Sequence, residues 1–168
     1  MAMQPALNLE ELRLTIVSHL PVHSRWLLRE TPLDWNFSRA AQTLRPLPEE
    51  EATGWAKVLP PDWRQMLIFG EQDVAEGGGA SPFLGVHAQT GEVFGLDVER
   101  EQSAAFLLNS SVPAFVNTFL LLDSALRVGD RLPSDMRDRI RAADPGVFEK
   151  SEWKEMVDYL DELTEDGA

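Results

Sequence analysis

The sequence predicts an α+β protein with a single, mostly antiparallel sheet flanked by helices. Apolar residues recur at helical spacing near both ends of the chain, whereas short strand-like runs follow one another closely between residues 65 and 108. Strands joined by short connections favour an antiparallel meander. The chain has 168 residues, of which 43% are hydrophobic, so we expect one domain, residues 1–168, with one core.

The first helix is predicted from a capping signal followed by an amphipathic pattern. Asn8 can accept a hydrogen bond from a backbone amide of the first turn, and Glu11 can reach back to the start of the helix. Pro21 ends the pattern, because proline lacks the amide that a helix interior needs. The apolar residues at helical spacing are Leu9, Leu12, Ile16 and Leu20.

After this helix, as far as residue 58, the pattern is weaker and we expect an irregular segment. Prolines interrupt it, and the three glutamates at positions 49–51 favour a short helix that carries Trp55. Trp26 and Trp35 have no apolar stripe to join, so the sequence leaves their burial open. Trp63 and Trp153 are expected in the core.

Strand-like runs dominate the middle of the chain. A glycine-rich loop, Glu71–Pro82, follows the first run, and Gly91 supplies the positive φ of a tight hairpin between the second and third. The expected strands are Gln65–Gly70, Phe83–His87, Glu92–Val98 and Ala104–Leu108.

Three helices are expected after the strands. A serine of the Asn109-Ser110-Ser111 segment caps the first, and Pro113 is tolerated in its first turn. Ser134 is expected to cap the second, which ends at Asp144-Pro145, and the third ends before Gly167. The apolar stripes of the first and third are Phe115, Phe119, Leu122 and Leu126, and Trp153, Met156, Val157 and Leu160.

The composition excludes several classes of function. The chain contains no cysteine, which removes thiolate nucleophiles and sulfur-ligated metal sites. Its formal net charge of −13 opposes binding to nucleic acid or to an anionic membrane. The charge indicates either a basic protein partner or a solubilising surface. The N-terminus lacks a signal-peptide pattern and no apolar run could span a membrane, so we expect a cytoplasmic protein.

No pattern in the sequence predicts a catalytic, cofactor or metal site. His19 and His23 are four residues apart, but Pro21 between them breaks the helical register. The glycines at positions 77–79 are not followed by the lysine and hydroxyl residue of a phosphate-binding loop. Asp97 and Glu99 share one side of a strand, which favours a charged binding face over acid–base catalysis.

Four segments carry a family resemblance. The first two are the Leu59-Pro60 turn leading into Met66–Gly70, and Phe83–Val86 with the Thr90-Gly91 turn into Val93. The others are Phe106–Ser111 followed by Phe115, and Asp144-Pro145 followed by Trp153. In this order and spacing, between Leu59 and Leu163, the chain resembles the SUKH superfamily and, within it, the SUKH-4 family of bacterial toxin immunity proteins.

The resemblance implies a SUKH-like α+β fold, no cofactor, and a role in sequestering a toxin effector domain without enzymatic activity. The negative charge fits a toxin domain with a basic surface. Two alternatives stay open, namely a cytoplasmic regulatory or scaffold module for a resident cellular protein, and a small hydrolase or nucleotide-processing enzyme that uses carboxylates. The candidate partner-binding residues are Asp73, Glu76, Asp97, Glu99 and Glu101.

Overall fold

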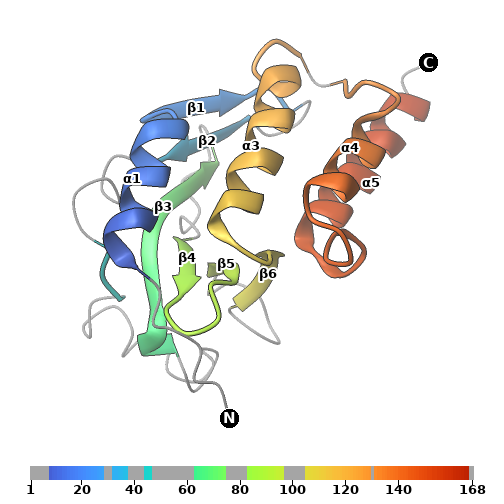
Figure 1. Ribbon diagram of the computed structural model, residues 1–168. Coiled ribbons are helices and arrows are strands. Elements are labelled where there is room, and N and C mark those ends of the chain that lie inside the picture. The colour runs from blue at the N-terminus through green and yellow to red at the C-terminus, as the bar shows by residue number, and fades with distance from the viewer. Residues whose placement is uncertain are drawn as a thin grey trace.

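The structure, a computed structural model, describes residues 8–28, 32–37, 44–46, 63–74, 83–96, 105–129 and 131–166. Its strands form one six-stranded sheet, in which each strand pairs antiparallel with the next along the chain (Figure 1). This confirms the predicted antiparallel meander. The strands are β1 His23–Trp26, β2 Leu33–Asn36, β3 Met66–Val74, β4 Phe83–His87, β5 Val93–Leu96 and β6 Ala105–Asn109.

The helices of the described part lie on one face of the sheet (Figure 1). One cluster of buried side chains joins all of them to the strands. The sheet therefore has an inner face, which packs against these helices, and an outer face, on which none of them packs. The helices are α1 Leu9–His19, α3 Val112–Leu126, α4 Met136–Ala143 and α5 Glu152–Asp166, with short 3-10 turns η1 Trp63–Gln65 and η2 Phe148–Lys150.

Two of the predicted helix caps are confirmed. The side chain of Asn8 accepts a hydrogen bond of 3.1 Å from the amide of Glu11 at the start of α1. Ser111 caps α3 in the same way, through a 3.2 Å bond from the amide of Ala114. For α4 the prediction is wrong by one residue, since Asp135 and not Ser134 is the N-cap, and no side chain caps this helix.

The segment expected to be irregular contains β1 and β2, which the sequence did not predict. Each strand has only four residues, and Trp26 and Trp35 each supply an inward-facing aromatic. Pairing with β2 also extends β3 to Val74, into the predicted glycine-rich loop. The helix expected around Trp55 and the glycines at positions 77–79 lie outside the described residues.

The predicted hairpin between β4 and β5 is confirmed. Gly91 has a φ of 79°, and its amide donates a 2.9 Å hydrogen bond to the carbonyl of His87. The ring of His87 is buried, and its Nδ1 accepts from the amides of Gln89 at 3.2 Å and Thr90 at 3.3 Å. The His87 ring therefore stabilises the turn by accepting hydrogen bonds from two of its backbone amides.

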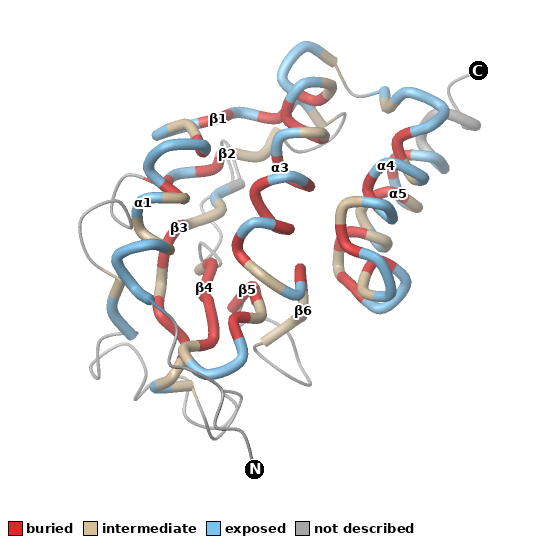
Figure 2. Tube along the Cα trace, in the orientation of Figure 1, coloured by how far each residue is buried: buried red, intermediate tan, exposed pale blue. Residues whose placement is uncertain are grey.

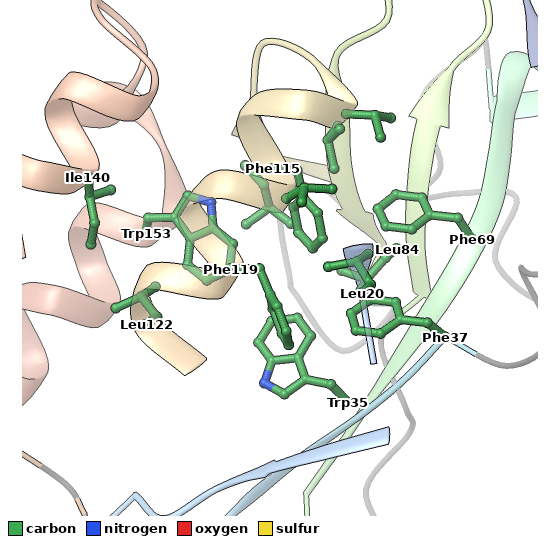
Figure 3. Packing of buried hydrophobic residues seen from close by; sticks show 14 of the residues in the cluster. Leu20, Trp35, Phe37, Phe69, Leu84, Phe115, Phe119, Leu122, Ile140 and Trp153 are labelled. Carbon is green, nitrogen blue, oxygen red and sulfur yellow. The ribbon is translucent and has the colours of Figure 1, made fainter. Parts of the chain in front are cut away.

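Aromatic side chains fill the centre of the core between the inner face and the helices (Figure 3). The ring centroids of Trp26 and Trp35 are 4.7 Å apart, and Trp153 of α5 lies 6.0 Å from Trp35. Phe115 and Phe119 of α3 pack against the same group, as their predicted stripe requires. Figure 2 shows buried positions along the central strands and on the inward sides of the helices. The core placement of Trp153 is confirmed, and Trp26 and Trp35 join it.

A smaller apolar cluster lies away from this core. Met66 and Leu96 are buried in it, and Trp63 is only partly buried against them, with the guanidinium of Arg64 4.5 Å from its ring. The expected core placement of Trp63 is thus met only in part.

Candidate partner-binding surface

Asp144 is a buried carboxylate whose acceptor oxygens are used within the fold. It accepts hydrogen bonds from Asn109 Nδ2 at 3.0 Å, the Ser110 amide at 2.8 Å and Ser110 Oγ at 2.6 Å. Asn109 in turn accepts a 2.7 Å bond from Trp153 Nε1. This network ties the end of β6 to the end of α4 and the start of α5, so a structural role accounts for the carboxylate.

Asp123 is the second buried carboxylate, and it also has a structural role. It accepts from the hydroxyl of Ser24 and, at 2.8 Å, from Trp26 Nε1, and Arg127 lies 3.6 Å away. These bonds fix β1 to α3. Hydrogen bonds within the fold thus account for both buried carboxylates of the described part.

The described part of the chain does hold a hollow of about 170 Å³ between α4 and α5, lined in part by Asp138 and Asp161. Both carboxylates are exposed, and both are paired with arginines. Arg141 lies 3.1 Å from Asp138, and Arg137 lies 2.6 Å from Asp161. The hydrogen bonds to Asp161 and Asp158 raise the pKa of Arg137. Ion pairs with Arg141 and Arg137 therefore account for both carboxylates of this hollow.

The histidines do not come together. His19 is exposed at the end of α1, His23 lies on the outer face of β1, and His87 is inside the hairpin. Within the described ranges no three metal-ligating side chains gather.

A polar surface occupies the outer face across β1, β2 and β3. Its residues are aligned by the strand register, and they are His23 and Arg25 of β1, Asp34 and Asn36 of β2, and Asp73 of β3. Arg25 Nε donates a 3.0 Å hydrogen bond to Asp34 Oδ1, and His23 Nε2 lies 3.3 Å from the same oxygen. The hydrogen bond from Arg25 lowers the pKa of Asp34. We call these five residues the outer polar face.

Of the predicted partner-binding residues, the structure places Asp73, which is exposed and directly opposite Asp34. Glu76, Asp97, Glu99 and Glu101 lie outside the described residues. Sequence reasoning missed His23, Arg25 and Asp34 because it did not predict the strands that carry them. The four residues of β1, of which only Trp26 is apolar, gave no period of two from which the strand could have been found.

No helix in the described part is long and apolar enough to cross a membrane. An antiparallel meander with its described helices on one face and, across β1 to β3, polar side chains exposed on the other defines an α+β protein. A family model described as SUKH-4 immunity protein matches residues 20–159, and the chain belongs to this family. The comparisons with curated proteins and with solved structures gave no match.

Proposed function

We propose that this protein binds a toxin effector domain in the cytoplasm and neutralises it by protein–protein contact, without a cofactor and without catalysis. The observation that carries the proposal is the match to the immunity protein family over residues 20–159. The buried carboxylates support a binding role, because Asp123 and Asp144 are committed to hydrogen bonds within the fold.

The charge of the protein supports a toxin domain with a basic surface. A formal net charge of −13 would draw such a domain toward the protein and would speed association at low ionic strength. Covering a basic substrate groove of the toxin would block its activity without any chemical step. We propose that the contact surface includes Asp73, together with Glu76, Asp97, Glu99 and Glu101.

Co-expression with the effector domain of a toxin encoded beside this gene tests the proposal. We expect the protein to restore growth, to form a stable complex with that domain, and to lose affinity as salt rises. A purified pair that does not associate, together with no protection of growth, would contradict the proposal. Recovery of resident cellular proteins alone on the immobilised protein would instead favour a regulatory or scaffold module.

A further inference from the structure

The outer polar face is an exposed part of the sheet on which none of the described helices packs. All the helices of the described part contribute to the core cluster on the inner face. The side chains of His23 and Arg25 are more than half exposed, and Asn36 and Asp73 are also exposed. This exposed part of the sheet can be reached by a folded domain whose charges complement those of the face.

The positively charged side chains of this face lie on only one side of Asp34. Arg25 and His23 contact Asp34 from the β1 side. Asp73 faces Asp34 from the β3 side, as its direct cross-strand partner. No cation in the described ranges forms an ion pair with Asp73. The carboxylate of Asp34 is therefore compensated on one side only.

Two carboxylates directly opposite each other on adjacent antiparallel strands repel, because their Cβ atoms are only about 5 Å apart. We therefore expect the opposed pair to lower the stability of the unbound protein. A cationic side chain that entered between Asp34 and Asp73 would remove the repulsion and would gain two attractive contacts. Arg25 repels a second cation on the β1 side, so the incoming group is directed toward Asp73.

We propose that the outer polar face is the docking surface for the basic toxin domain, and that a lysine or arginine of that domain is received between Asp34 and Asp73. This inference rests on the proposed function, and it adds the surface and the chemistry of the contact. It brings Asp34, Arg25 and His23 into the interface as residues that position the cation.

The proposal predicts opposite effects of one substitution on stability and on binding. Asp73→Asn keeps the shape of the side chain but removes the repulsion, so its Tm is expected to rise by about 1 to 3 °C. The same variant should bind the effector domain of the neighbouring toxin about tenfold more weakly in calorimetry. Asp73→Lys, which can pair with Asp34, should be at least as stable as Asp73→Asn and should bind still more weakly.

Glu155→Gln provides the matched control, because it makes the same change in net charge at an exposed position of α5, on the helix side of the molecule. It should leave the affinity within about twofold of that of the wild type. An Asp73→Asn variant that binds as tightly as the wild type, or that loses affinity no more than Glu155→Gln does, would overturn the docking surface.

Binding by the wild type and binding by the Asp73 variants, measured separately, distinguish a failure of this inference from a failure of the proposed function. If the wild-type protein binds the effector domain but Asp73 substitutions have no effect, only the surface is wrong. If the wild type does not bind, the proposed function fails and the docking surface fails with it. A fall in Tm for Asp73→Asn would show that Asp34 and Asp73 do not repel, which would also overturn the inference.

Discussion

Asp144 accepts hydrogen bonds from Asn109 and Ser110, 35 and 34 residues earlier in the chain, and its own neighbours in sequence gave no sign of this. A proline follows it, so it was predicted only as the residue at which a helix ends. In the structure it is 5% exposed and accepts three hydrogen bonds. The prediction of the helix end is confirmed, but the partners Asn109 and Ser110 depend on tertiary contacts that a sequence pattern does not encode.

Replacing Asp144 by alanine should lower the free energy of unfolding by about 3 kcal/mol, because the buried amide of Asn109 and the part-buried donors of Ser110 would lose a charged acceptor. Urea denaturation followed by circular dichroism measures the loss. Asp138→Ala is the control, since Asp138 has a side chain that is 82% exposed and its variant should change stability by less than about 0.5 kcal/mol. Equal effects of the two variants would contradict a structural role for Asp144.

The pair of Arg25 and Asp34 predicts a dependence of stability on pH. Arg25 lowers the pKa of Asp34 in the folded protein, so the pair contributes stability above the pKa of the unfolded chain, about 3.9. That contribution is lost as pH falls through the folded pKa. Arg25→Met should therefore be less stable than the wild type at pH 7, by up to about 1 kcal/mol, and the difference should shrink toward pH 3.

Parallel denaturation curves at the two pH values check this prediction. Arg139→Met is a control, because Arg139 pairs with Asp135 at the start of α4 and not with Asp34 of the sheet. A difference between Arg25→Met and the wild type that grows as pH falls would contradict the assigned direction.

At the scale of elements, the sequence was most informative where a local signal sufficed. The caps at Asn8 and Ser111, the stripe of α3 and the turn at Gly91 are each built by residues close in the chain, and all are confirmed. β1 and β2 are different, because four residues are too few to establish a period of two. Their pairing with each other and with β3 creates the outer polar face, so missing them meant missing most of that surface.

β5 contains a glycine in its interior, and the structure gives the reason. A Cβ atom added at Gly95 would lie 2.2 Å from Cζ of Phe106 on the neighbouring strand β6. Gly95→Ala should therefore displace that ring and destabilise the protein by about 1 to 3 kcal/mol. Thermal unfolding followed by calorimetry measures the effect.

Gly129→Ala is the matched control, because nothing lies within 4 Å of a Cβ added at Gly129. It should be neutral or slightly stabilising. If Gly95→Ala is also neutral, then the ring of Phe106 moves aside without loss, and close packing does not account for the glycine.

At the scale of the whole molecule, the fold class was predictable because it depends on the order of helix-like and strand-like segments. The placement of the tryptophans was not. Trp26, Trp35 and Trp153 come from β1, β2 and α5, and they meet only because α3 and α5 pack on the same face of the sheet. The choice of face depends on packing between distant segments, which periodicity within one segment cannot specify.

The net charge of −13 also acts on the whole molecule. Repulsion among the carboxylates opposes the compact state, and raising the ionic strength from about 0.01 to 0.15 M shortens its range from about 30 to 8 Å. The Tm should therefore rise with sodium chloride over this range. A fall would mean that screening of ion pairs such as Arg137 with Asp158, at 2.8 Å, outweighs the relief of repulsion.

The buried group of indoles gives the protein an intrinsic optical reporter. With ring centroids 4.7 to 6.3 Å apart, the transitions of Trp26, Trp35 and Trp153 are close enough to couple, and unfolding would separate them. The backbone of the sheet stands between this group and the outer polar face. Near-ultraviolet circular dichroism can therefore follow folding without a label, and it can distinguish a variant that fails to dock from one that has lost its fold.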